Sequence, residues 1–162
     1  ASRIPEFDVL FGPAYKGIPL ATAMACELAQ RGRDLPLSFT RKAVKDHGEG
    51  GQLIRADLTG KRVLIVDDVI TAGTAIREAL AIIRAAGGIP AGIVVALDRQ
   101  EIASEADHRP AAQAVAEEAG IPVIAVATLA DLLDFASGNP ELVGYRQPLE
   151  AYRAQYGVRS AR

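Results

Sequence analysis

Short runs of apolar residues alternate along this chain with longer stretches in which alanine and leucine are spaced among polar residues. The first pattern is typical of strands buried on both faces, and the second is typical of helices that pack on them. Strands are expected at 7–12, 36–41, 62–69, 91–98 and 121–127, with a short return strand near 52–55. Helices are expected at 17–30, 72–88, 111–120, 128–137 and near 141–157.

Residues that start or stop helices agree with these boundaries. Gly32 follows the first expected helix, Gly87 and Gly88 end the second, and Thr128 is placed to cap the fourth. Strands that alternate with helices predict an α/β fold, in which a doubly wound, mostly parallel sheet is flanked by helices on both faces.

Polar residues stand where the expected strands end. They are the segment Gly12 to Gly17, the pair Arg41 and Lys42, the pair Asp67 and Asp68, and the pair Asp98 and Arg99. Ligands of doubly wound sheets bind beyond the carboxyl ends of the strands. These segments are therefore the candidates for a functional site.

Composition limits the classes of protein that this chain can belong to. Its 162 residues suit a single domain spanning 1–162, and 49% hydrophobic with 23% charged residues is the balance of a globular protein. A net charge of −2 gives no overall basic field for nucleic acid. The single Cys26 excludes an internal disulfide, and its alanine-rich surroundings predict a buried side chain.

The N-terminus and the apolar runs bear on location. No apolar run approaches the roughly 18 residues of a membrane span, and residues 1–12 lack the pattern of a signal peptide. A cytoplasmic location is expected. The chain begins without Met and enters a strand within a few residues, so we expect its first part to be missing.

The stretch VLIVDDVITAGTA, residues 63–75, changes abruptly from apolar to acidic to small residues. Carboxylates accept hydrogen bonds from hydroxyls, so Asp67 and Asp68 suit the diol of a ribose, or help to position a divalent metal. Thr71, Gly73 and Thr74 at a helix start suit a phosphate. The alternative is an acidic pair that caps a turn. Neither a dinucleotide-binding glycine pattern nor a P-loop is present.

A second stretch, RKAVKDHGEGG at residues 41–51, gathers cations, one histidine and three glycines without apolar periodicity. It predicts either a solvated hairpin tip or a mobile lid whose Lys and His side chains neutralise a polyanion.

Two further segments offer single candidates. Tyr15 and Lys16 follow the first strand, with Gly12 and Gly17 placed to let the backbone approach a ligand. Arg99 is suited to bind a carboxylate, or to pair with a neighbouring acid. His108 is expected at the surface.

Together these residues resemble a known family. VLIVDDVITAGTA looks like the phosphoribosyl diphosphate-binding signature of the type I phosphoribosyltransferases. FGPAYKGIPLA (11–21), the loop 41–51 and LDRQE (97–101) resemble segments of the orotate phosphoribosyltransferases in order and spacing. The resemblance extends from about Phe7 to Val158. The family's N-terminal hood over the orotate is not found in this sequence.

The resemblance implies a reaction and a site. The family transfers the phosphoribosyl group of phosphoribosyl diphosphate to orotate with Mg²⁺, giving orotidine 5′-phosphate and diphosphate in pyrimidine synthesis, and works as a homodimer whose loop 41–51 reaches the neighbouring active site. The catalytic loop residues would be Arg41, Lys42, Lys45 and His47. Phosphoribosyl diphosphate would contact these four and Tyr15, Lys16, Asp67, Asp68, Val69, Ile70, Thr71, Ala72, Gly73, Thr74 and Ala75.

Orotate would contact Thr71 and Arg99. No direct protein ligand to Mg²⁺ is expected, since the metal would be held through the diphosphate, with Asp67 and Asp68 reached through water.

Two other functions remain open on the sequence. A phosphoribosyltransferase for another base, such as a purine, would share the Asp67–Asp68 signature, but a neutral purine offers Arg99 no carboxylate. A non-catalytic nucleotide-binding regulator of the same fold has no need of the cations of the lid, all of which are present.

Overall fold

The computed structural model describes residues 4–40, 53–54 and 56–158. Its strands are β1 (Val9–Gly12), β2 (Leu37–Thr40), β3 (Leu53–Ile54), β4 (Arg62–Val69), β5 (Ile89–Asp98) and β6 (Val123–Thr128). Its helices are α1 (Gly17–Gln30), α2 (Thr74–Ala85), α3 (Ala111–Ala119), α4 (Leu129–Gly138) and α5 (Val143–Tyr156). Every expected strand and helix is present, with ends that match the expected ones or differ by a few residues.

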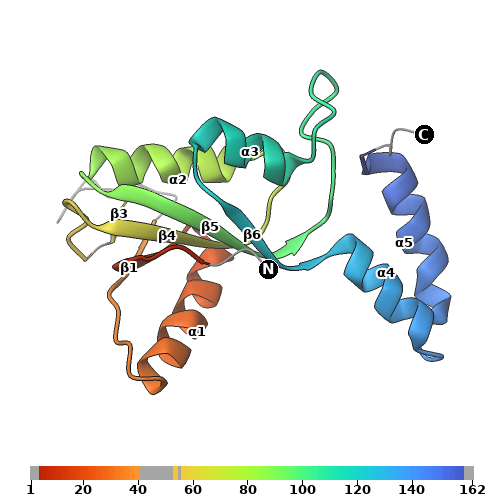
Figure 1. Ribbon diagram of the computed structural model, residues 1–162, viewed down its shortest axis with the longest axis horizontal. Helices are drawn as coiled ribbons and strands as arrows, with labels where there is room; N and C mark the ends of the chain where they lie inside the picture. The colour runs from red at the N-terminus through yellow and green to blue at the C-terminus, as the bar shows by residue number, and fades with distance from the viewer. Residues whose placement is uncertain (1–3, 41–52, 55, 159–162) are drawn as a thin grey trace.

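The strands form one six-stranded sheet in the order β3-β2-β1-β4-β5-β6. All neighbouring pairs are parallel except β2 and β3, which pair antiparallel at one edge. Helix α1 lies on one face of the sheet, and α2 and α3 lie on the other (Figure 1). The predicted doubly wound, mostly parallel α/β fold is confirmed.

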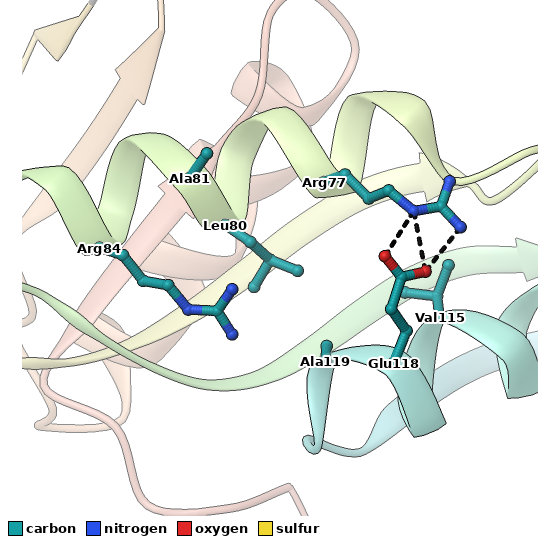
Figure 2. Close-up of a pocket in the computed structure, with 7 residues that line it drawn as sticks. All are labelled: Arg77, Leu80, Ala81, Arg84, Val115, Glu118 and Ala119. Carbon is teal, nitrogen blue, oxygen red and sulfur yellow. Dashed lines mark hydrogen bonds and ion pairs between the residues drawn. The ribbon is translucent and has the colours of Figure 1, made fainter.

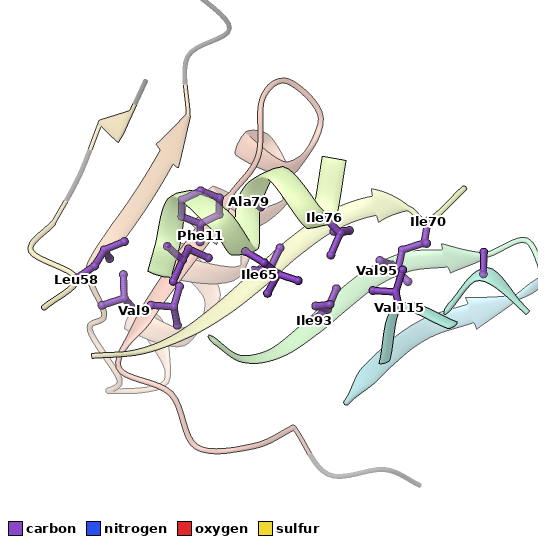
Figure 3. Close-up of a cluster of buried hydrophobic side chains, with 14 residues drawn as sticks. Val9, Phe11, Leu58, Ile65, Ile70, Ile76, Ala79, Ile93, Val95 and Val115 are labelled. Carbon is purple, nitrogen blue, oxygen red and sulfur yellow. The ribbon is translucent and has the colours of Figure 1, made fainter. Parts of the chain in front are cut away.

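Side chains of the central strands alternate between two apolar cores, one on each face. The core under α2 and α3 includes Phe11, Ile65 and Ile93 from the strands, with Ile76 and Val115 from the helices (Figure 3). The core under α1 takes the intervening residues, Leu10, Leu64 and Val94. Burial on both faces explains why these strands read as continuous apolar runs rather than as alternating ones.

Helix α4 begins as the sequence predicts. The Thr128 hydroxyl accepts a hydrogen bond from the Asp131 N–H, and the Asp131 carboxylate accepts one from the Thr128 N–H, which completes a capping box. Helices α4 and α5 pack against each other beyond the β6 edge of the sheet (Figure 1).

The prediction that Cys26 is buried is wrong, because its side chain is exposed. The buried side of α1 carries Gly17 and Ala21, with Met24, Ala25 and Leu28 packed on the same core. A residue five positions after Ala21 lies on the opposite side of a helix with 3.6 residues per turn. Alanine-rich surroundings therefore did not distinguish the two sides of this helix.

None of the helices in the described residues is long and apolar enough to cross a membrane.

Candidate active site

The sheet has a topological switch point between β1 and β4. From β1 the chain continues through α1 to β2 on one side, whereas β4 continues through α2 to β5 on the other. Helices α1 and α2 lie on opposite faces of the sheet. In sheets with this topology, the ligand crevice lies outside the carboxyl ends of the two strands at the switch point. The loops that follow β1 and β4 were both candidate segments on sequence grounds.

A pocket of about 340 Å³ occupies this crevice. Ala14, from the loop after β1, lines one side. The other side is formed by the segment that follows β4, through Val69, Ile70, Thr71, Gly73, Thr74, Ala75, Ile76 and Glu78. We call residues 70–75 the phosphate loop. The structure thus brings the small-residue segment of the VLIVDDVITAGTA motif to a concave surface beside the end of β1.

The phosphate loop ends at the amino terminus of α2. Gly73 is the N-cap residue, and no side chain caps the helix there. Thr71 and Thr74 are both exposed beside it. The uncapped N–H groups and the positive end of the helix dipole favour an anion at this position.

Gly73 has a structural reason to be glycine that differs from the expected one. Its φ of 76° lies in the left-handed region, and an added Cβ would come within 2.6 Å of Val115 Cγ2 on α3. The missing side chain therefore makes room for α3. On the sequence, Gly73 was interpreted only as part of a turn suited to a phosphate.

The two adjacent carboxylates at the end of β4 lie in different environments. Asp67 is only 7% exposed, and burial, with the neighbouring charge of Asp68, raises its pKa to about 6. Its Oδ1 accepts a hydrogen bond of 2.9 Å from the Asp68 N–H. Asp67 is thus a carboxylate held at a fixed position at an energetic cost.

Asp68 is more accessible and forms an ion pair across the crevice. Burial alone would raise its pKa, but a 2.8 Å hydrogen bond from Lys16 Nζ and one from the Val69 N–H outweigh burial and lower it. Lys16 follows β1 and Asp68 ends β4, so the two strands are connected at the site by opposite charges. The Lys16 side chain is 76% exposed, and the Tyr15 residue beside it is 66% exposed.

Gly12 and Gly17 allow close backbone packing, although they were expected to admit a ligand. An added Cβ on Gly12 would lie 2.7 Å from the Gly17 carbonyl oxygen, and one on Gly17 would lie 2.7 Å from the Val66 carbonyl oxygen. Because neither residue has a side chain, the start of α1 can pack directly on β1 and β4. The Ala14 N–H donates a 2.9 Å hydrogen bond to Thr40 Oγ1, which ties this loop to β2.

Arg99 follows β5, the strand next to β4, in which Leu97 pairs with Val69. It lies at the same edge of the sheet as the phosphate loop but does not line the pocket. Arg99 Nε is 3.1 Å from Glu101 Oε1, and Glu101 in turn accepts a hydrogen bond from the Tyr152 hydroxyl on α5. Within the described residues, Nε is buried without a hydrogen bond of good geometry. Arg99 is half-buried and pairs with a neighbouring acid, as one interpretation of the sequence predicted. It also lies at the edge of the sheet where the other interpretation placed a bound carboxylate.

The four candidate catalytic residues Arg41, Lys42, Lys45 and His47 lie outside the described residues. The structure does describe the strands on either side of them. In the antiparallel pair of β2 and β3, Thr40 is opposite Leu53. His108 is exposed, as expected.

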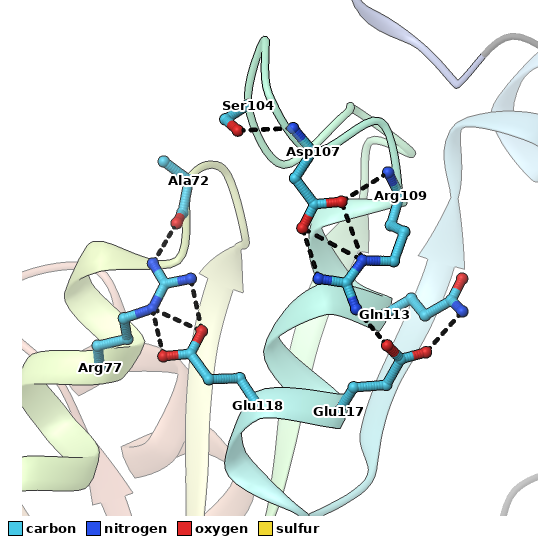
Figure 4. Close-up of polar contacts among 8 residues, drawn as sticks. All are labelled: Ala72, Arg77, Ser104, Asp107, Arg109, Gln113, Glu117 and Glu118. Atoms are coloured by element: carbon cyan, nitrogen blue, oxygen red, sulfur yellow. Dashed lines mark hydrogen bonds and ion pairs between the residues drawn. The ribbon is translucent and has the colours of Figure 1, made fainter.

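Sequence reasoning did not find the residues that support the site from behind. Arg77 on α2 is paired with Glu118 on α3 and donates a hydrogen bond to the carbonyl of Ala72 in the phosphate loop (Figure 4). Glu101 and Tyr152 hold Arg99 in a similar way. The contacts of Arg77 with Glu118 and of Tyr152 with Glu101 join residues 41 and 51 positions apart. Periodicity carries no signal for pairs so distant along the chain.

The described residues contain no group of three or more His, Cys, Asp or Glu that could hold a metal ion. Asp67 and Asp68 supply oxygen ligands, which Mg²⁺ prefers, and Mg²⁺ usually keeps several waters and binds substrate phosphates. The pair therefore fits a metal that is held mainly by a bound diphosphate.

Residues 5–118 match the family model of the phosphoribosyl transferase domain. An orotate phosphoribosyltransferase of Stenotrophomonas maltophilia is 89% identical over 157 residues, which are 97% of this chain and 72% of the relative. A crystal structure of the Francisella tularensis orotate phosphoribosyltransferase is similar, with a TM-score of 0.75 and 35% identity over 94% of this chain and 71% of that one.

The orotate phosphoribosyltransferase of Mycobacterium tuberculosis in complex with 5-phospho-α-D-ribosyl 1-diphosphate is also similar. The TM-score is 0.62 at 28% identity, over 78% of this chain and 66% of that one. The family model covers β1 to β5, the phosphate loop and Arg99 together. This chain belongs to the orotate phosphoribosyltransferase family.

Proposed function

We propose that this chain transfers the 5-phosphoribosyl group of phosphoribosyl diphosphate to orotate, giving orotidine 5′-phosphate and diphosphate. The observation that carries the proposal is the crevice between β1 and β4. There a pocket lined by the phosphate loop and the uncapped start of α2 lies next to the ends of the two strands, which carry the ion pair of Lys16 and Asp68. An acceptor for hydroxyls and a site for phosphate are thus placed side by side, as a ribose 5-phosphate requires.

Asp67 and Asp68 bind the ribose hydroxyls in this proposal, and residues 71–75 bind the 5′-phosphate, with Val69 and Ile70 in contact. The lowered pKa of Asp68 keeps it ionised at neutral pH, and the pKa of about 6 leaves Asp67 largely ionised there as well. Both carboxylates are then acceptors for hydroxyls. The crystal structure of the related enzyme of Mycobacterium tuberculosis in complex with phosphoribosyl diphosphate supports this compound as the ligand.

Lys16 and Tyr15 bind the diphosphate end of the substrate. Lys16 is highly exposed, and its ion pair with Asp68 lies at the surface, so it costs little to exchange for a diphosphate. Its position across the crevice from the phosphate loop supports this role. Binding of diphosphate would draw Lys16 from Asp68 and release that carboxylate toward the ribose.

The chemical step needs positioned charges and no nucleophilic side chain. Cleavage at the ribose C1 develops positive charge on the sugar, as in glycoside hydrolysis, and negative charge on the leaving diphosphate. Asp67 and Asp68 lie on the sugar side of the crevice. We assign the diphosphate side to Arg41, Lys42, Lys45 and His47, with His47 as a proton donor to the leaving group.

Replacing Lys45 tests the loop assignment. Lys45→Ala should lower kcat by about 100-fold or more and change the KM of either substrate only a few-fold, since the charge acts on the transition state. Steady-state kinetics with both substrates varied measure this split. A Lys45→Ala enzyme that turns over at the normal rate would exclude the assignment.

The Mg²⁺ requirement of the proposal rests on the oxygen donors of the acidic pair and on the substrate diphosphate. When bound, the ion neutralises diphosphate charge and helps it to leave. Asp67 and Asp68 would help to hold it through water. Dialysis against a chelator should abolish turnover, and added Mg²⁺ should restore it without a change in the melting temperature.

We also propose a homodimer in which loop 41–51 reaches the partner's site, and a single domain formed by residues 1–162. One continuous sheet in the described residues supports the single domain. Mixing two inactive variants, Lys45→Ala and Asp68→Ala, tests the dimer. Mixed dimers regain activity at one site in two if the loop acts on its neighbour, and stay inactive if it acts on its own subunit. The expected cytoplasmic location stays a prediction.

The decisive assay is the fall in orotate absorbance after phosphoribosyl diphosphate and Mg²⁺ are added to the full-length protein. Adenine, hypoxanthine and guanine tested in parallel address the alternative of a purine enzyme, and tight substrate binding without turnover would indicate a regulator. Arg99→Lys, which keeps the charge but loses the planar fork, should raise the KM for orotate by about tenfold.

A further inference from the structure

We propose that Arg77 and Glu118 are positioning residues that hold the phosphate loop in its binding conformation from outside the pocket. Neither residue lines the pocket in the crevice, so neither is expected to touch the substrate. The inference rests on the proposed role of residues 71–75 in phosphate binding.

The Arg77 guanidinium divides its donors between two partners. Its Nε lies 2.9 Å from each oxygen of Glu118, and Nη2 lies 2.7 Å from Glu118 Oε2. Its Nη1 donates a 2.6 Å hydrogen bond to the carbonyl oxygen of Ala72 (Figure 4). The fork on Glu118 fixes the plane of the guanidinium, which leaves Nη1 pointing at the loop.

Ala72 immediately precedes Gly73, the residue with the left-handed backbone that turns the loop into α2. A hydrogen bond to the Ala72 carbonyl sets the orientation of the peptide unit between these two residues. The same peptide carries the Gly73 N–H, which points opposite to the carbonyl. Fixing the carbonyl toward Arg77 therefore directs this N–H away from Arg77.

The packing around the loop leads to the same conclusion. An added Cβ on Gly73 would meet Val115 of α3 at 2.6 Å and Arg77 Nη1 at 3.2 Å. Val115, Glu118 and Arg77 also line a small cavity of about 190 Å³ between α2 and α3 (Figure 2). The phosphate loop is thus supported from behind by α3, through one apolar contact and one charged bridge.

A purely stabilising role does not account for this arrangement. The side chains of Arg77 and Glu118 are 43% and 55% exposed, and ion pairs so exposed contribute little to stability. A loop that must present donors to a phosphate loses affinity when its backbone orientation is no longer fixed. We therefore expect the loss of the bridge to change phosphate binding much more than unfolding.

The chain supplies matched controls. Glu117, beside Glu118 on α3, forms an equally exposed ion pair with Arg109, which does not reach the phosphate loop (Figure 4). Arg84 lies two turns after Arg77 on α2 and lines the same small cavity. Glu117→Gln and Arg84→Lys therefore repeat the chemical changes of Glu118→Gln and Arg77→Lys away from the loop.

The test compares ribose 5-phosphate affinity by calorimetry and steady-state kinetics across these variants. Arg77→Lys should raise the Kd for ribose 5-phosphate and the KM for phosphoribosyl diphosphate by about tenfold, because one ammonium cannot hold both partners. Glu118→Gln should raise them by about threefold. The KM for orotate and the melting temperature should stay near those of the parent protein, and both control variants should match the parent.

Equal effects of Glu118→Gln and Glu117→Gln, or a normal ribose 5-phosphate affinity in Arg77→Lys, would overturn the inference. Hydrogen exchange of the amides of residues 72–75 gives a second readout, which should speed up most in Arg77→Lys, less in Glu118→Gln and not at all in the two control variants. Thr74→Val separates the proposed role of the phosphate loop from the proposed role of Arg77. If it leaves ribose 5-phosphate binding intact, the proposed role of the loop fails. If it weakens binding and Arg77→Lys does not, only the role of Arg77 fails.

Discussion

At the scale of single residues, Asp67 shows the conflict between function and stability most directly. A carboxylate that is 7% exposed at the end of a buried strand raises the free energy of the folded state, because burial disfavours its charge. An apolar or amide side chain at this position would avoid the cost. The need for a carboxylate that binds a ribose diol explains why this cost in stability is tolerated.

The effect of the buried Asp67 on the free energy of unfolding depends on pH in a definite direction. The pKa of Asp67 is about 6 in the folded protein, against 3.8 for an unperturbed aspartate. Between about pH 4 and pH 6 the folded chain keeps a proton that the unfolded chain releases, so Asp67 makes stability fall as pH rises. Above pH 6 the cost is constant, and a pKa difference of about 2 corresponds to roughly 3 kcal/mol.

Asp67→Asn should therefore raise the free energy of unfolding by about 1–3 kcal/mol at pH 8 and by much less at pH 4.5. Denaturant titrations at the two pH values measure the difference. Turnover should fall at least tenfold, since an amide accepts hydroxyl hydrogen bonds more weakly than a carboxylate does.

Asp68→Asn is the matched control for this prediction. The pKa of Asp68 is lowered by Lys16, so its replacement should give no gain in stability at pH 8. A gain of the same size at both pH values in Asp67→Asn would contradict the burial argument.

At the scale of elements, the phosphate loop depends on a turn that only glycine adopts without strain. Gly73→Ala should destabilise the protein by about 2–4 kcal/mol, because the added Cβ meets both a left-handed backbone and Val115. The KM for phosphoribosyl diphosphate should rise in parallel. Denaturant unfolding and kinetics on the same preparation measure both effects.

Gly120→Ala separates the cost of the left-handed backbone from the cost of the steric contact with Val115. Gly120 has a similar φ of 69° but no atom within 4 Å of an added Cβ, so its replacement should cost only about 1 kcal/mol. Adding Val115→Ala to Gly73→Ala should recover part of the loss if the steric contact contributes. Equal costs at Gly73 and Gly120 would show that only the backbone conformation matters.

The elements themselves were largely predictable from the sequence. The strand expected at 62–69 is β4 with the same bounds, and the helix expected at 17–30 is α1 with the same bounds. Thr128 caps α4 as expected. Such elements are determined by local periodicity and by capping residues, which a single sequence contains in full.

The contacts between loops were not predictable in the same way. Lys16 and Asp68 are 52 residues apart, and only the order of the strands places them together. The sequence identified both as candidate site residues, yet gave no indication that they pair. Arg77 was overlooked because its helix position marks it as an ordinary solvated charge. Its role becomes visible only when α3 is placed beside it.

At the scale of the whole molecule, α5 reaches the candidate orotate site without burying any residue of its own. Its end is joined to the segment after β5 by two backbone hydrogen bonds, from the Ile102 N–H to the Tyr156 carbonyl and from the Val158 N–H to the Gln100 carbonyl. Near these two bonds, the Tyr152 hydroxyl donates a hydrogen bond to the Glu101 carboxylate. The C-terminal helix thus sets the position of the acid that pairs with Arg99.

Tyr152→Phe should weaken orotate binding through this chain of contacts. Without the hydroxyl, Glu101 loses a donor and its charge draws Arg99 more strongly, which leaves less of the guanidinium for the orotate carboxylate. We expect the KM for orotate to rise by about three- to tenfold, with the KM for phosphoribosyl diphosphate unchanged. Tyr145→Phe, at an exposed position on the same helix, should have no effect. A rise in both KM values in Tyr152→Phe would point instead to a general loosening of α5, and unchanged values would show that Arg99 acts without its support.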